Sequence, residues 1–87
     1  MTKITIGKGI IEIRGHSGYG SIGTDIVCSA ISTASQYLQN LTNCEYEETE
    51  DGYKLHISSS NINAVVYIDL MKQLEVQYKD YVKVIGG

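Results

Sequence analysis

The chain has 87 residues, enough for one domain with one hydrophobic core, so we expect residues 1–87 to form a single domain. Its formal net charge is −3 and its acidic residues concentrate between Glu45 and Asp51, which argues against direct binding to nucleic acid. Two cysteines are too few for a disulfide framework, and no run is apolar enough for a signal segment or a membrane span.

These exclusions favour a cytoplasmic protein with reduced thiols and without a membrane partner. A core of this size is marginal without disulfides, so we also expect a homodimer that buries a shared surface. The sequence has no zinc-ligand spacing such as CxxC or HExxH, and we expect neither a metal nor another cofactor.

Two short runs rich in β-branched residues open the chain and predict a β-hairpin. The run Lys3–Ile6 alternates polar and apolar residues, and Ile10–Arg14 follows after Gly7-Lys8-Gly9. Because Ile11 and Ile13 share one face of the second strand, we expect that face to be covered and the other to be partly wet.

A loop with three glycines follows the hairpin and begins at His16. Gly18, Gly20 and Gly23 make its backbone permissive, and Ser17, Tyr19 and Ser21 add no apolar anchor. We therefore expect this loop to move.

The first helix begins after Thr24 or Asp25, either of which is a suitable N-cap, and ends between Asn40 and Asn43. Apolar residues at helical spacing predict its core face: Val27, Ala30, Ile31, Ala34, Leu38 and Leu41. Cys28 lies on a flank of the first turn, aligned with Asp25 and with Ser32.

A second hairpin is predicted from Cys44–Glu50 and Tyr53–Ser58, which flank the turn Glu50-Asp51-Gly52. On the returning strand Leu55 shares the covered face with Tyr53 and Ile57, and His56 points outward.

Polar residues at 58–61 offer caps for a second helix that runs to about Tyr78, and Val82–Ile85 forms a last strand. The spacing predicts a buried stripe on this helix, made of Ile62, Val66, Leu70, Leu74 and Tyr78. The order ββαββαβ indicates a two-layer α+β domain with a largely antiparallel sheet and both helices on one face.

Cys28 is the candidate nucleophile. A helical cysteine is more often a small buried apolar residue, but the free N–H groups and the dipole of a first helical turn favour a thiolate. The same N–H groups are candidate donors to an oxyanion during acyl transfer. Cys44 has no such setting and is interpreted as structural.

His16 is the candidate proton acceptor and donor for Cys28, because it precedes a permissive loop beside the helix start. The alternative is a solvated loop histidine. Asp25 orients His16, binds a substrate N–H, or caps the helix by accepting from the N–H of Cys28, and capping is the favoured role. Ser32 is a candidate donor to the sulfur or to His16, although a helical serine usually bonds its own backbone.

The loop also contains the pattern GxGxxG at 18–23, with Glu45 about 20 residues further on, as in dinucleotide-binding folds. Asp25 stands where a pyrophosphate would bind, and the chain is too short for a doubly wound sheet, so this interpretation is disfavoured. The acidic block from Glu45 to Asp51 is most simply a solvated hairpin face, with docking of a basic partner as the alternative.

Taken together, Gly15-His16, the glycine-bearing loop and the run DIVCSAIS at 25–32 resemble the signature of the bacterial ribosomal-processing cysteine protease family, Prp. That family has a GHAGY-like segment followed by DIVCAAVS at the same spacing, and Ser17 and Ser29 stand here in place of the commoner alanines.

The resemblance implies that Cys28 is the nucleophile, that His16 is its partner, and that Asp25 and Ser32 support the site. It also implies a homodimer and a mobile substrate loop, with positions Gly15, Ser17, Gly18, Tyr19, Gly20 and Gly23. The implied substrate is the precursor of a large-subunit ribosomal protein, number twenty-seven, whose apolar and aromatic N-terminal extension is removed before the protein works in the ribosome.

Two alternatives remain at this point. The first is a non-catalytic, ribosome-associated or assembly domain that only holds a peptide in its groove. The second is a redox-sensing thiol, for which Cys28 would cycle with oxidation and no peptide would be cut.

Overall fold

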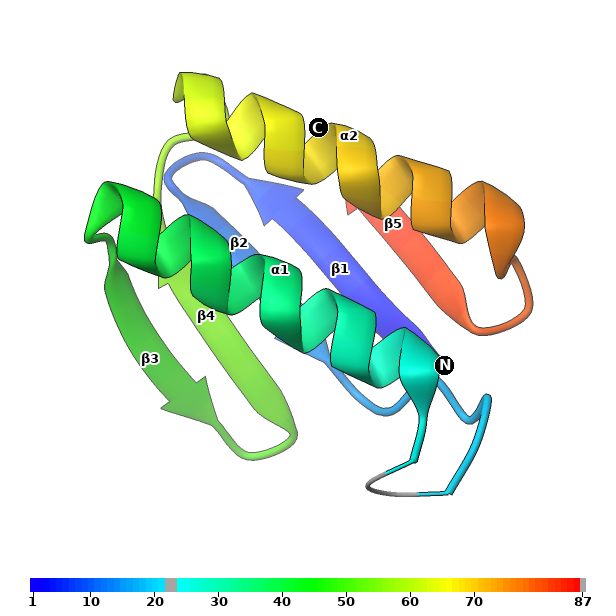
Figure 1. The fold of residues 1–87 in the computed structure, drawn as a ribbon. Helices are drawn as coiled ribbons and strands as arrows, with labels where there is room; N and C mark the ends of the chain where they lie inside the picture. The colour runs from blue at the N-terminus through cyan, green and yellow to red at the C-terminus, as the bar shows by residue number, and fades with distance from the viewer. Residues whose placement is uncertain (22–23, 87) are drawn as a thin grey trace.

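The structure, a computed structural model, describes residues 1–21 and 24–86, and its elements follow the predicted order ββαββαβ. The elements along the chain are β1 (Thr2–Gly7), β2 (Ile10–Arg14), α1 (Ile26–Thr42), β3 (Glu45–Thr49), β4 (Gly52–His56), α2 (Ile62–Gln77) and β5 (Val82–Gly86) (Figure 1). Each predicted element is present, and its bounds differ from the prediction by no more than two residues.

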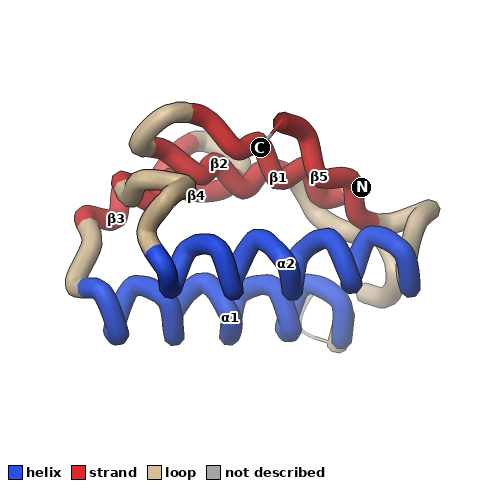
Figure 2. Tube along the Cα trace, turned by 90° about the horizontal axis from the view of Figure 1, so that it is seen from above, coloured by secondary structure: helices blue, strands red, loops and turns tan. Residues whose placement is uncertain are grey.

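The strands form one sheet in the order β3-β4-β2-β1-β5. All neighbouring pairs are antiparallel except β1 and β5, which are parallel. Both helices cover the same face of this sheet, as Figure 2 shows from above. The predicted two-layer α+β architecture with a largely antiparallel sheet is therefore confirmed.

The first hairpin turns through Lys8 and Gly9, because Gly7 is paired with Ile10. Gly9 has a φ of +72°, which a residue with a side chain rarely adopts. Ile11 and Ile13 are buried beneath the helices, so the predicted covered face of the hairpin is correct.

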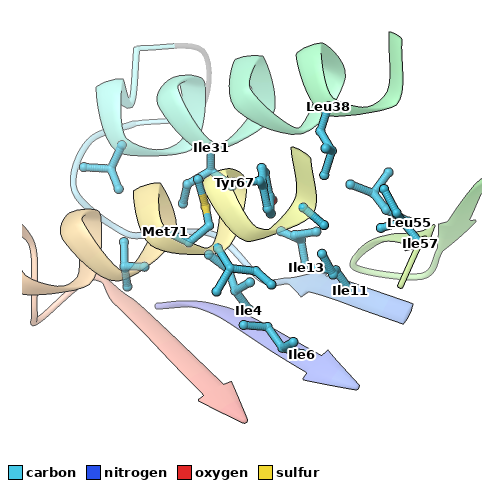
Figure 3. Close-up of a cluster of buried hydrophobic side chains, with 14 residues drawn as sticks. Ile4, Ile6, Ile11, Ile13, Ile31, Leu38, Leu55, Ile57, Tyr67 and Met71 are labelled. Atoms are coloured by element: carbon cyan, nitrogen blue, oxygen red, sulfur yellow. The ribbon is translucent and has the colours of Figure 1, made fainter. Parts of the chain in front are cut away.

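The core lies between the sheet and the two helices, and Figure 3 shows its side chains. Its largest fully buried members include Ile4, Ile11 and Leu55 from the sheet, Ile31 from α1 and Met71 from α2. One polar pair lies inside it: the hydroxyls of Ser35 and Tyr67 are 2.7 Å apart, and Ser35 also donates to the carbonyl of Ile31 at 2.8 Å. Both buried hydroxyls thereby have partners, as a small core requires.

Helix α1 buries a narrower stripe than the sequence predicts. Val27, Ile31 and Leu38 are buried as expected, but Leu41 is 54% exposed and Ala30 is also exposed. Ser35 takes a core position instead, because its hydroxyl is hydrogen-bonded to the hydroxyl of Tyr67 on α2.

Helix α2 turns the opposite way from the prediction. Three residues of the predicted buried stripe, Ile62, Val66 and Leu70, are 77%, 66% and 42% exposed. Leu74 and Tyr78 are only partly buried. The residues that face the sheet are Ala64, Tyr67, Ile68 and Met71.

The physical reason is that α2 carries apolar residues on two sides, so helical spacing alone fits either face. Packing against the sheet selects the side with the ring of Tyr67 and the flexible side chain of Met71. Neither described helix combines the length and the apolar character needed to cross a lipid bilayer.

Candidate active site

Helix α1 starts at Asp25, which is the N-cap of the two residues that the sequence allowed. Its Oδ1 atom accepts hydrogen bonds from the backbone N–H groups of Val27 at 2.9 Å and of Cys28 at 3.0 Å. The favoured capping role of Asp25 is therefore confirmed.

The second oxygen of the same carboxylate holds the loop. Oδ2 accepts from the hydroxyl of Ser17 at 2.5 Å and from the N–H of Gly20 at 3.1 Å, and the Ser17 hydroxyl accepts from the N–H of Tyr19 at 3.1 Å. The Ser17 hydroxyl, with the N–H groups of Cys28, Gly20 and Val27, holds the pKa of Asp25 well below its usual range against the opposing effect of burial. The loop is thus tied to the start of the helix by an ionised carboxylate.

Cys28 lies in the first turn of α1 and is half-buried. The backbone N–H of Ser17 donates to its Sγ atom at 3.2 Å. This donor is already in place for the negative charge that a nucleophilic thiolate carries. The thiol is therefore neither enclosed in the apolar core nor free of the loop.

His16 lies two residues after the end of β2, and it is exposed. The preceding Gly15 has a φ of +81°, and a Cβ at this position would lie 2.8 Å from the carbonyl oxygen of Met1. The N–H of Gly15 donates to the carbonyl of Asp51 at 2.9 Å. The backbone before His16 is therefore held between the start of β1 and the turn of the second hairpin.

A cavity of about 590 Å³ brings most of the predicted site residues together. Its lining includes Gly15, His16, Gly18, Gly20, Asp25, Cys28 and Ser32. The buried Ser17 and the ring of Tyr19 are not part of this lining, and Gly23 lies outside the described residues. We call this space the catalytic cavity.

The opposite wall of the catalytic cavity comes from the second hairpin, which sequence reasoning did not assign to the site. Glu48, Thr49, Glu50, Asp51 and Tyr53 contribute to it. The pairing of Arg14 with Gly52 places the hairpin turn beside His16. A Cβ on Gly52 would overlap the carbonyl of Ile13, so this close approach requires glycine.

Among the residues that the structure describes, neither predicted partner of Cys28 is hydrogen-bonded to its sulfur. Neither His16 nor Ser32 has such a bond with the sulfur or with the other, although all three line the same cavity. Their catalytic roles stay predictions, since catalytic hydrogen bonds often form only when the substrate is bound.

Three of the helix-start N–H groups that the sequence offered as oxyanion donors already have acceptors. The N–H groups of Val27 and Cys28 both donate to Asp25, and the N–H of Ser29 donates to the Asp25 carbonyl. Since a committed donor does not hold a second acceptor at full strength, those N–H groups are not free for an oxyanion. The oxyanion role of the helix start therefore stays a prediction, and these three N–H groups do not support it.

Tyr19 anchors the loop, contrary to expectation. Its ring packs edge-on against Tyr78 and Tyr81, with centroids 5.4 Å and 5.2 Å apart. Such pairs each stabilise the packed form by about 0.5–1.5 kcal/mol. No local pattern reveals this contact, because its partners are about 60 residues further along the chain.

The dinucleotide interpretation of the glycine pattern is further weakened by the position of Asp25. Its carboxylate accepts from the N–H of Gly20 and from two N–H groups at the helix start. A pyrophosphate would need these same donors, and the negative charge would repel it. Within residues 1–21 and 24–86, no three His, Cys, Asp or Glu side chains gather as metal ligands do.

The remaining thiol and imidazole lie elsewhere. Cys44 follows Asn43, the residue that caps the C-terminal end of α1, and packs against the core, as its structural interpretation predicts. His56 faces the open side of the second hairpin, where its Nε2 lies 2.9 Å from Glu47 Oε1.

A family model described as "Cysteine protease Prp" matches residues 1–83. No curated protein matches the chain in sequence.

Three solved structures resemble the fold. The S. aureus ribosomal processing protease Prp with a covalently linked product peptide has a TM-score of 0.73 and 17% identity, over 97% of this chain and 95% of that one. The same S. aureus protease with a substrate peptide has a TM-score of 0.65 and 16% identity, over 95% and 94%. SMU.848 from Streptococcus mutans has a TM-score of 0.67 and 25% identity, over 98% and 94%.

Proposed function

The chain belongs to the cysteine protease Prp family, and on this premise we propose that it removes the N-terminal extension of a large-subunit ribosomal protein, number twenty-seven, in the cytoplasm. Cys28 is the nucleophile, and His16 is its proton acceptor and later its proton donor. The resemblance of residues 15–32 to the family signature supports this substrate, as does the likeness in fold to a ribosomal processing protease solved with a substrate peptide.

The chemistry proceeds in two steps. His16 takes the thiol proton, the sulfur attacks the scissile carbonyl carbon, and the protonated imidazole gives its proton to the leaving amine. A water molecule, deprotonated by His16, then attacks the thioester and releases the acid product together with the thiol. The loop at 17–21 moves as the peptide enters and brings the imidazole to the sulfur.

One observation carries this proposal. Cys28 and His16 line one cavity, and the half-buried sulfur at the helix start accepts the backbone N–H of Ser17 at 3.2 Å. Cys44, the thiol interpreted as structural, packs against the core and does not line this cavity. Glu48 and Glu50 in the opposite wall also suit a basic substrate, which ribosomal proteins generally are because they contact phosphates.

The experiment is incubation with the extended ribosomal precursor, followed by mass spectrometry of the products. Wild type cuts the precursor once, Cys28→Ala does not cut it, and Cys44→Ala cuts it at the wild-type rate. Circular dichroism of both variants checks that they are folded. Loss of cleavage in both variants, or in neither, contradicts the assignment of Cys28.

The alternative of a non-catalytic peptide-binding domain is favoured by two features of the site. His16 and Cys28 share no hydrogen bond within the described part of the chain, and the helix-start N–H groups are occupied by Asp25. A binding domain would bind the precursor equally well as wild type and as Cys28→Ala, and wild type would release no product.

A homodimer is part of the same proposal. The outward face of α2 exposes Ile62, Val65, Val66, Leu70 and Val76. An apolar row of this kind is unusual on a monomer and is typical of an interface. We define these five residues as the α2 face and place the shared surface there.

The α2 face is tested by light scattering coupled to gel filtration. Wild type is expected at twice the mass of one chain, and Val66→Glu at the mass of one chain, because a buried charge without a partner opposes association. The matched control is Tyr37→Glu on the outer side of α1, where the side chain is 68% exposed. A wild-type monomer, or a dimer in Val66→Glu, contradicts this placement.

A further inference from the structure

The hydroxyl of Tyr53 is buried without a hydrogen-bond partner among the described residues. Its ring is stacked on Tyr46, with centroids 5.5 Å apart and an angle of 27° between the planes. Ser35 lies near, but its hydroxyl already has the Ile31 carbonyl and the Tyr67 hydroxyl as partners. An orphaned buried hydroxyl costs free energy, so its position calls for an acceptor.

Tyr53 stands between two cavities. It lines the catalytic cavity, and it also lines a neighbouring cavity of about 330 Å³ between α1 and the second hairpin. Ser32 is the other residue that both cavities share. The neighbouring cavity, which we call the side cavity, continues along α1 past the amides of Gln36 and Gln39.

The residues that line this junction favour the binding of a peptide main chain. The side cavity is lined by neutral polar side chains, by Tyr46 and Tyr53, and by the apolar Leu55, so it has no charge with which to select an ion. An extended peptide that leaves the scissile bond through this opening places a carbonyl oxygen at every residue. A phenol that keeps its proton is a suitable donor to such an oxygen.

Burial supports that protonation state, because it raises the pKa of Tyr53 above its ordinary value. The hydroxyls of Ser35 and Ser32 lie near enough to oppose this rise in pKa in part, but neither reaches hydrogen-bond geometry with the phenol. The Tyr53 hydroxyl therefore keeps its proton at neutral pH and can donate it to a hydrogen bond.

We propose that Tyr53 is a positioning residue whose hydroxyl donates to a main-chain carbonyl of the substrate peptide where the catalytic cavity opens into the side cavity. This inference rests on the proposed function for the identity of the peptide. It goes beyond it by assigning the second wall of the site, on β4, a role in holding the substrate.

The test uses Tyr53→Phe, which removes the oxygen and keeps the ring stack. Binding is measured in the Cys28→Ala background, with a synthetic peptide that spans the extension and the first residues of the mature protein. The dissociation constant is expected to rise about threefold to tenfold, the range for one hydrogen bond. In the active protein KM rises by the same factor and kcat stays within about twofold.

A second readout separates positioning from a structural role. Because Tyr53→Phe removes an unpartnered buried oxygen, the unfolding temperature stays the same or rises. Tyr37→Phe, which removes a hydroxyl on the outer side of α1, is the matched control and leaves binding, kinetics and unfolding unchanged.

The outcomes are distinct. Weaker peptide binding by Cys28→Ala/Tyr53→Phe supports the inference even if wild type cuts nothing, in which case the proposed protease activity alone fails. Unchanged affinity, a lower unfolding temperature with unchanged affinity, or a fall in kcat alone overturns the inference. Absence of peptide binding by Cys28→Ala overturns both proposals.

Discussion

Both helices begin with a side-chain N-cap, but the two caps differ in what else they contact. Asp25 accepts from the N–H groups of the second and third residues of α1, and Asn61 accepts from those of Asn63 and Ala64 in α2. The third residue of α1 is Cys28, half-exposed to the catalytic cavity, whereas the third residue of α2 is Ala64, which is fully buried.

The difference lies in what approaches each cap. The second oxygen of Asp25 accepts from Ser17 and Gly20, so the cap of α1 also fixes a loop over the sulfur. The amide of Asn61 has bonds only to its own helix among those that the described residues make. The start of α1 therefore acts as a scaffold, and the loop that Asp25 binds completes the candidate site.

The largest expected effect comes from removing the imidazole beside the α1 cap. His16→Ala should lower kcat/KM by about 10²–10⁴, the usual contribution of a general acid–base group. The measurement is initial rates on the extended precursor peptide. His56→Ala is the control, because it breaks only an exposed pair with Glu47. Equal losses in the two variants would remove the catalytic assignment from His16.

A smaller effect separates the two caps directly. Asp25→Ala should lower kcat/KM by roughly 10²-fold, the scale of a small misplacement of reacting groups, because the loop is released from the helix. Asn61→Ala should leave kcat/KM within about twofold and lower the free energy of unfolding by about 1 kcal/mol. Rates and urea unfolding on both variants make the comparison. An active Asp25→Ala protein would show that the tie is only structural.

Lowering the pH should further distinguish the cap of α1 from the cap of α2. The folded pKa of Asp25 lies below its usual value, so its ionised form stabilises the protein fully above the unfolded pKa of about 4. This contribution is lost as the pH falls below that value. The difference in unfolding midpoint between wild type and Asp25→Asn should therefore be largest near neutral pH and shrink below about pH 4. The difference for Asn61→Ala should not change with pH, since an amide does not titrate.

The smallest effect concerns the contact that joins the loop to the far end of α2. Tyr19→Leu removes two edge-on contacts, with Tyr78 and Tyr81, of about 0.5–1.5 kcal/mol each. We expect faster hydrogen exchange at the N–H groups of Gly18 and Gly20 and a loss of a few-fold in kcat/KM. Tyr37→Leu is the control. Unchanged exchange would show that Asp25 alone holds the loop.

Much of the site was predictable because its residues are close in the chain. His16 and Cys28 are separated by 12 positions, and the cap at Asp25 follows from its residue type before a helical pattern. The N–H of Ser17 on the sulfur was missed, since a backbone contact leaves no mark in the sequence. Tyr53 was read only as a core-facing residue of a hairpin.

The fold was predictable for a similar reason, and the error in the predicted buried face of α2 has a physical cause. Alternation placed Ile11 and Ile13 correctly, because a strand has only two faces. On α2 the same reasoning chose the face with Ile62 and Val66, which is exposed, because two apolar sides satisfy helical spacing equally.

The sequence by itself determined the order of elements, the start of α1 and the presence of a thiol and an imidazole at one end of it. Local propensities, capping groups and short-range spacing decide these features. The tertiary structure alone decided which side of α2 is buried, and it alone brought Tyr53 and the acidic turn to the cavity across from Cys28. Those outcomes depend on strand pairing between β2 and β4, and such pairing joins residues that no local pattern relates.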